Sequence, residues 1–150
     1  MSTTSPTREP LQIDVRGPRF SAALTSAVLV TAYLLQSEVV LALQLAVFAV
    51  AGIAGLRWSP YGNVFRLLKR RLDLGPPPAT EPEAGPRFSQ IMGLLVTGAG
   101  LLAVLSGSTG LGWALVLVVV ALSALLAVTG ICVGCEMYAL GQQVRAARQA

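Results

Sequence analysis

The chain has 150 residues, of which 54% are apolar and only 12% are charged, and its formal net charge is +4. Soluble domains carry about 25% charged residues, and a chain of this length is too small to bury so large an apolar excess in its interior. The composition therefore excludes an ordinary soluble globule and a large multidomain enzyme. It predicts a protein that exposes apolar surface to a membrane.

Four apolar stretches without Lys, Arg, Asp or Glu follow one another along the chain. Each approaches the roughly 17–25 residues that a helix needs to cross a bilayer. Because none of them alternates apolar and polar residues as barrel strands do, helices are favoured. We predict an all-α fold with four transmembrane helices, at about 20–37, 39–56, 88–105 and 111–132.

The eleven basic residues lie in three segments: before the first predicted helix, between the second and the third, and after the fourth. Four spans place these segments on one side of the membrane, and the positive-inside rule predicts that this side is the cytoplasm, with both termini there. Because this topology accounts for the charge, nucleic acid is not an expected partner. The cations expected at the membrane interface, beside anionic headgroups, are Arg19, Arg57, Arg66, Lys69, Arg70, Arg71 and Arg87.

The pentapeptide GPRFS at 17–21 recurs at 85–89, each copy standing before an apolar stretch. The residues at 55–56 likewise match those at 130–131, after the second and fourth stretches. We interpret the chain as an internal repeat of two helical hairpins in the same orientation, related by an axis along the membrane normal. The alternative is that GPRF merely suits the turn into a membrane helix, since Pro fixes the bend and Arg meets headgroups.

Between the two hairpins, Ser59 and Pro60 form a helix start signal. An apolar face and a basic face follow, which predict a short cytoplasmic amphipathic helix in the headgroup layer. The next segment, 74–86, is rich in Pro and is predicted to be a flexible or extended cytoplasmic loop. We expect a disordered cytoplasmic tail, a four-helix membrane domain and a cytoplasmic amphipathic tail at 1–15, 16–145 and 136–150, respectively.

Histidine is absent, which removes the usual general base at neutral pH and the commonest metal ligand together. No glycine pattern of the phosphate-binding kind occurs, and we expect neither a cofactor nor a metal ion. Most hydrolytic and metal-dependent reactions are therefore disfavoured. Gln44, the one strongly polar side chain near the middle of a predicted span, is expected to hydrogen-bond between helices.

The two cysteines form a C-x-x-C pattern, Cys132 and Cys135, at the cytoplasmic end of the fourth predicted span. If the helix continues, the pair shares one face with Cα atoms about 5–6 Å apart, inside the range for a disulfide. If Gly130 or Gly134 breaks the helix, the pair instead starts a new helix, whose N-terminus favours a thiolate. Either geometry permits reversible oxidation.

The candidate site is therefore the dithiol of Cys132 and Cys135, with Glu136 as a modulator that opposes thiolate formation and Arg57 or Arg145 as cations that favour it. One alternative is that the cysteines are packing residues. Another is an all-cysteine, four-ligand metal site shared by two chains. A structural disulfide is not expected on the reducing cytoplasmic face.

The segments GLRWSPYGNVFR and TGICVGCEMY, with the RGPRF that starts the first span, resemble the bacterial membrane-protein family called domain of unknown function 4395. The resemblance covers about 14–145. Cys132, Gly134 and Cys135 match the C-x-G-C element of that family, and Glu136 and Tyr138 fit the residues after it. The resemblance implies the four-span fold, a bacterial inner-membrane location and this choice of candidate residues, and it implies no established activity.

Our first functional hypothesis is an accessory for thiol/disulfide exchange or sulfur relay, whose partner is a thioredoxin-like or rhodanese-like cytoplasmic protein. Which cysteine is the nucleophile stays open. The alternative is a non-catalytic accessory or scaffold subunit of a larger membrane complex, or a homodimer. A small transporter is disfavoured, because no ionisable residue lies within a predicted span.

Overall fold

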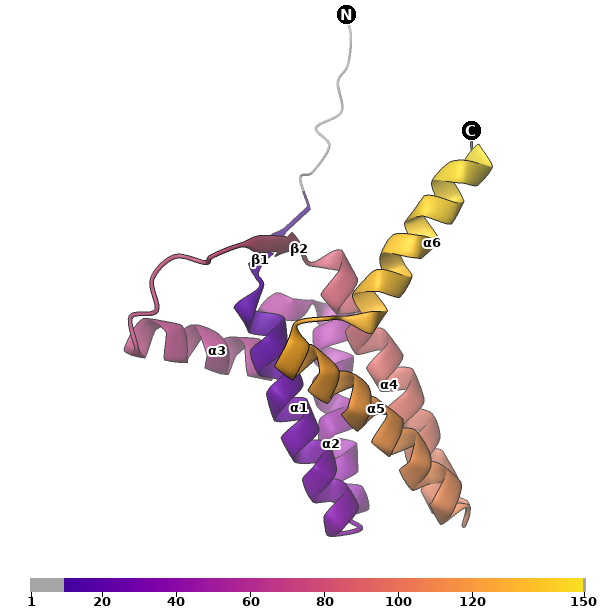
Figure 1. Ribbon diagram of the computed structural model, residues 1–150. Helices are drawn as coiled ribbons and strands as arrows, with labels where there is room; N and C mark the ends of the chain where they lie inside the picture. The colour runs from indigo at the N-terminus through magenta and orange to yellow at the C-terminus, as the bar shows by residue number, and fades with distance from the viewer. Residues whose placement is uncertain (1–9, 150) are drawn as a thin grey trace, which may run out of the picture.

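The computed structural model describes residues 10–149 and shows an all-α protein (Figure 1). Six α-helices make up most of this described part, with a π-helical segment, a 3-10 turn and a two-stranded sheet between them. In chain order the elements are β1 (Gln12–Asp14), α1 (Arg16–Leu34), α2 (Glu38–Ala49), η1 (Val50–Ala54), η2 (Leu56–Trp58), α3 (Pro60–Arg71), β2 (Thr80–Pro82), α4 (Ala84–Leu105), α5 (Thr109–Thr129) and α6 (Val133–Gln149).

Helices α1, α2, α4 and α5 form a bundle of two helical hairpins (Figure 1). α1 packs on α5, α2 packs on α4, and α4 and α5 pack on each other. A Cβ at Gly100 would lie 3.0 Å from the carbonyl oxygen of Gly112, so glycine lets α4 and α5 approach closely, as small residues do between membrane helices. The buried core takes apolar side chains from all four helices: Leu29, Ala32, Leu41, Phe48, Val104, Trp113, Val116 and Val119.

Gln44 of α2 is buried and links α1 and α3 to its own helix. The hydroxyl of Tyr61 on α3 donates to Gln44 Oε1 at 2.5 Å, and Gln44 Nε2 donates to Thr25 Oγ1 on α1 at 3.5 Å. Burial raises the pKa of Tyr61, so its hydroxyl keeps the proton that it donates. The expected interhelical role of Gln44 is confirmed, and the contact holds the start of α3 against the bundle.

Among the described residues, α4 and α5 are long and apolar enough to cross a membrane. α2 and η1 together make a shorter apolar helix, Glu38–Ala54, and α1 contains Arg16, Arg19 and several hydroxyl side chains, which lower its hydropathy. Two of the four predicted spans are thus supported, and four transmembrane helices are not confirmed. Only 22% of the most apolar 18-residue stretch of α4 and of α5 is buried. These two exposed apolar helices suggest a membrane protein.

A small antiparallel sheet of β1 and β2, which the sequence pattern did not indicate, lies at one end of the bundle (Figure 1). Residues 12–14 of the tail expected to be disordered, 1–15, form β1. The segment 74–86, expected to be a flexible or extended loop, contains the strand β2 and ends in the first turn of α4. Residues 1–9 of that expected tail lie outside the described residues. The sheet joins the segments that lead into the two hairpins.

Asp14 at the end of β1 fastens the sheet to the helices. Its carboxylate forms ion pairs with Arg16 and with Lys69 of α3, both at 2.9 Å. Burial opposes ionisation of Asp14, but hydrogen bonds from Arg16 and Lys69 outweigh it and hold the pKa of this carboxyl well below its usual range. The carboxylate therefore stays charged at neutral pH and ties β1, α1 and α3 together.

The two hairpins make equivalent contacts at equivalent positions. In the sheet, Ile13 of β1 lies opposite Glu81 of β2. These two residues are equivalent in the repeat, because they are separated by the same number of residues as the two GPRFS copies. The arginines of the two pentapeptides also have equivalent roles. Arg19 donates to the carbonyls of residues 127 and 128 at the end of α5, at 3.3 and 3.2 Å, and Arg87 donates to those of residues 52 and 53 in η1, at 2.8 and 2.7 Å. Each hairpin thus caps a helix end of the other, whose last carbonyls lack partners.

Candidate functional site: the cysteine pair at the start of α6

Gly130 ends α5 in the left-handed conformation, with φ of +79°. The chain turns there and α6 begins at Val133. Of the two geometries that the sequence left open, the structure therefore has the break before the cysteines. Glycine suits this position, because residues with a side chain rarely adopt such a φ.

Cys132 is the N-cap of α6. Its Sγ accepts the backbone N–H of Cys135 at 3.2 Å, and its carbonyl accepts the backbone N–H of Glu136 at 3.0 Å. Helix α3 begins in the same way, because Ser59 Oγ accepts the N–H of Gly62 at 3.3 Å. Cys132 thus takes the place of a serine cap. Its sulfur lies where unpaired N–H groups and the helix dipole favour negative charge.

Cys132 and Cys135 are joined by a disulfide, with Cα atoms 5.2 Å apart, within the usual range for such bonds. Both residues are half-buried. The expectation that this geometry permits oxidation of the pair is confirmed. The expectation that the bond is not a permanent structural disulfide stays a prediction. Cys132 is the cap of α6 and Cys135 is its third helical residue. The two side chains face each other in the first turn, so the two sulfurs lie within bonding distance.

Ser89 of α4 lies beside both sulfurs. Its Oγ is 3.1 Å from Cys132 Sγ and 3.7 Å from Cys135 Sγ, and it also donates to the carbonyl of Gly85 at 3.3 Å. Gly134 makes this approach possible, because a Cβ there would lie 2.9 Å from Ser89 Cβ. Sequence reasoning missed Ser89 as a site residue. The sequence did carry one signal: Ser89 is the last residue of the second GPRFS copy. This copy begins the third predicted span, which pairs in a hairpin with the span that ends at the cysteines.

Glu136 and the two cations expected to influence the thiols have other surroundings. Glu136 is exposed in the first turn of α6, where its charge faces solvent. Arg57 lies over the ring of Trp58, 5.2 Å from its centroid. Arg145 follows Cys135 by ten residues, about 15 Å along a helix, on the part of α6 that extends away from the bundle (Figure 1). The structure therefore does not bring Arg145 to the sulfur pair.

The remaining cations predicted at the interface lie on or beside α3. Arg66 donates to the carbonyl of Arg57 and to Asn63, Lys69 pairs with Asp14, and Arg70 and Arg71 are exposed. Arg57, Arg66 and Lys69 line a cavity of about 340 Å³ next to β1. Their contact with lipid stays a prediction.

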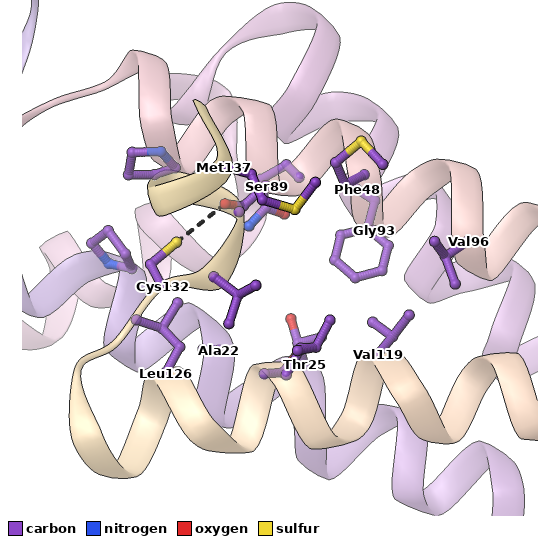
Figure 2. Close-up of a pocket in the computed structure, with 18 of the residues that line it drawn as sticks. Ala22, Thr25, Phe48, Ser89, Gly93, Val96, Val119, Leu126, Cys132 and Met137 are labelled. Atoms are coloured by element: carbon purple, nitrogen blue, oxygen red, sulfur yellow. Dashed lines mark hydrogen bonds between the residues drawn. The ribbon is translucent and has the colours of Figure 1, made fainter. Parts of the chain in front are cut away.

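A second, mostly apolar pocket of about 190 Å³ lies beside the disulfide. Cys132 and Ser89 lie near one end of it and Val96 near the other (Figure 2). Side chains from all four bundle helices and the start of α6 form its wall. Of the two cysteines, Cys132 is the one that contributes to this wall.

In residues 10–149, no group of three or more His, Cys, Asp or Glu side chains is placed to hold a metal ion. The four-cysteine site between two chains, which the sequence left open as an alternative, is not tested by a single chain.

The family described as Domain of unknown function (DUF4395) matches residues 13–143. No curated protein and no solved structure matches the chain.

Proposed function

Because this chain belongs to the family described as a domain of unknown function, DUF4395, which names no activity, we propose from its own geometry that it exchanges thiols and disulfides at the cytoplasmic face of a membrane. The observation that carries the proposal is the position of Cys132. Its sulfur is the N-cap of α6, accepts a backbone N–H at 3.2 Å, and is bonded to Cys135.

This position makes Cys132 the better leaving group of the pair. Exchange is faster when the departing sulfur is stabilised as a thiolate, and helix N-termini stabilise thiolates. A thiolate of the partner attacks the sulfur of Cys135, and the Cys132–Cys135 bond breaks with its electron pair on Cys132. A second thiol of the partner then resolves the mixed disulfide and releases Cys135. The partner dithiol is oxidised to a disulfide, and this pair is reduced to two thiols.

The membrane setting is part of the proposal. It is supported by the exposed apolar surface of α4 and α5 and by the basic residues around the sheet end of the bundle, where α3 lies across the helix direction (Figure 1). We place four spans in the inner membrane, with both termini and α6 in the cytoplasm. A thioredoxin-like or rhodanese-like cytoplasmic protein is the partner class that fits a dithiol at this face.

The test uses the full chain in phospholipid vesicles, equilibrated with glutathione buffers of increasing oxidation, quenched with acid and alkylated. We expect Cys132 and Cys135 to convert together between dithiol and disulfide, and a reduced thioredoxin to reduce the disulfide. A Cys132→Ser, Cys135→Ser double variant is the matched control, which should exchange nothing. Thiols that resist alkylation in every buffer, or a disulfide that thioredoxin leaves intact, would overturn the proposal.

One observation favours the alternative of an accessory subunit. Met137, Leu140 and Val144 recur along one face of α6 and are more than half exposed, which is typical of a helix that packs on a partner. Substituting Leu140→Glu should release a partner subunit from the purified complex if this reading holds, and it should leave the redox behaviour of the cysteines unchanged.

A further inference from the structure

The pocket beside Cys132 lies within the helix bundle and could hold a small molecule next to the cysteine pair. We propose that this pocket binds the ring of a lipid-soluble quinone, which accepts the two electrons that the dithiol releases. The inference rests on the proposed function, because it names the acceptor of the same cysteine pair.

The size and chemistry of the pocket fit one ring. Its volume is about 190 Å³, and an apolar cavity of about 150 Å³ is known to hold benzene in another protein. The wall is largely apolar, with Phe48 and Val119 on opposite sides (Figure 2). Gln90 and Ser123 line it and carry hydrogen-bond donors, which suit the two carbonyl oxygens of a quinone.

The pocket also borders the apolar surface that the proposed membrane would cover. Val118 and Leu122 of α5 line it and are 52% and 44% exposed. A ligand dissolved in the bilayer can therefore reach the pocket between these side chains without crossing water. A hydrophilic oxidant is disfavoured in this pocket, because no charged side chain lines it to replace the water that the oxidant would lose.

The electron balance assigns separate roles to the two sulfurs. The Cys132 thiolate, which borders the pocket, forms a bond to a ring carbon of the quinone. The Cys135 thiolate then attacks the Cys132 sulfur, the carbon–sulfur bond breaks with its electron pair on the ring, and the ring takes up two protons as quinol. Two thiols are oxidised to one disulfide, and one quinone is reduced to one quinol.

The experiment uses the reduced full chain in phosphatidylcholine vesicles and follows two oxidants separately. One is a short-chain ubiquinone analogue, repeated with a short-chain menaquinone analogue, and the other is oxidised glutathione. We expect one quinol for each disulfide formed. In Cys135→Ser, the Cys132 thiolate should form a covalent quinone adduct, seen as a mass shift, because no second thiol can release the ring.

Two neighbouring alanines provide the matched variants. Ala22 is buried and lines the pocket, whereas Ala23 on the same turn of α1 is exposed. Ala22→Leu should fill the pocket and slow the quinone reaction by about tenfold, while the glutathione reaction stays within about twofold. Ala23→Leu should leave both rates unchanged. If Ala22→Leu also loses the glutathione reaction, Ser123→Leu, which narrows the pocket from α5, is judged by the same two rates.

The outcomes separate the two proposals. Equal quinone rates in Ala22→Leu and Ala23→Leu, or a wild-type chain that glutathione oxidises and quinone does not, overturn the quinone pocket and leave thiol exchange standing. A cysteine pair that neither oxidant converts overturns the proposed function itself.

Discussion

Helices α3 and α6 follow the two hairpins at equivalent places, and they differ most at their first residue. Ser59 caps α3 with an oxygen, and Cys132 caps α6 with a sulfur that accepts the same kind of N–H at a similar distance. Each helix also packs an aromatic ring on the phenylalanine of its pentapeptide: Phe65 on Phe20, and Tyr138 on Phe88. The comparison teaches that a sulfur can replace the oxygen of a helix cap and still accept the backbone N–H, and that a second cysteine three residues later then lies within reach of a disulfide.

The largest expected effect, on disulfide formation and thiol exchange, comes from replacing the cysteine cap of α6 with the serine that caps α3. Cys132→Ser removes one sulfur and should abolish disulfide formation and exchange completely, yet it should keep α6 folded, because serine is a preferred cap. Alkylation with mass detection measures the first effect, and far-ultraviolet circular dichroism measures the second. Loss of helix in this variant would show that the disulfide, rather than the cap, holds α6.

A glycine in the first turn of each helix gives the next comparison: Gly134 lies two residues after its cap, and Gly62 lies three residues after its cap. Gly134→Ala should lower the free energy of unfolding by about 1–3 kcal/mol, since its Cβ would overlap Ser89. Gly62→Ala is the matched change in α3 and should cost less, because its nearest contact would be 3.1 Å, to the carbonyl of Leu56. Thermal unfolding in detergent compares them. Equal losses would mean that α6 does not depend on its close contact with α4.

The serine of each pentapeptide sharpens the comparison further. Ser89→Ala removes a hydroxyl 3.1 Å from Cys132 Sγ. It should slow thiol exchange by about ten- to a hundredfold, because a hydrogen bond to a charged group contributes about 1.5–3 kcal/mol. Ser21→Ala, at the equivalent place in α1, should leave exchange unchanged. Rates of alkylation against pH provide a second readout: Ser89→Ala should need a higher pH, and an unshifted profile would contradict the role of Ser89.

The smallest effect is expected at the sheet, where Asp14 in the first repeat corresponds to Pro82 in the second. Because the folded-state pKa of Asp14 is lowered, its stabilisation is present above the usual carboxyl pKa of about 4 and is lost as the pH falls through the folded value. Asp14→Asn keeps an oxygen that can accept a hydrogen bond but loses the charge, and it should cost about 1 kcal/mol at neutral pH. It should also remove part of the acid destabilisation, measured as the melting temperature at neutral and strongly acidic pH. An identical acid profile in the variant would contradict this assignment.

The helices could be predicted because long apolar stretches and start signals such as Ser59-Pro60 are local features of the sequence. The contacts of Gln44 were foreseen for the same reason, since a lone amide in an apolar helix needs partners. Pairing of β1 with β2 was not foreseeable, because strands of three residues carry no alternation pattern and depend on a partner far along the chain. Ser89 and the pocket escaped notice since both arise from the packing of α4 against α5 and α6. The break at Gly130 was one of two open geometries, and only the backbone conformation decided between them.

The exchanged arginine caps have a consequence for synthesis of the chain. Arg87 hydrogen-bonds to carbonyls 34 and 35 residues earlier in the chain. Arg19 hydrogen-bonds to carbonyls 108 and 109 residues later, which are synthesised long after it. When the first hairpin leaves the ribosome, the carbonyls at the end of η1 therefore lack the hydrogen bonds from Arg87, and the guanidinium of Arg19 lacks its acceptors on α5. Both sets of hydrogen bonds form only after the second hairpin has been made. We therefore expect the two halves to reach their final structure together.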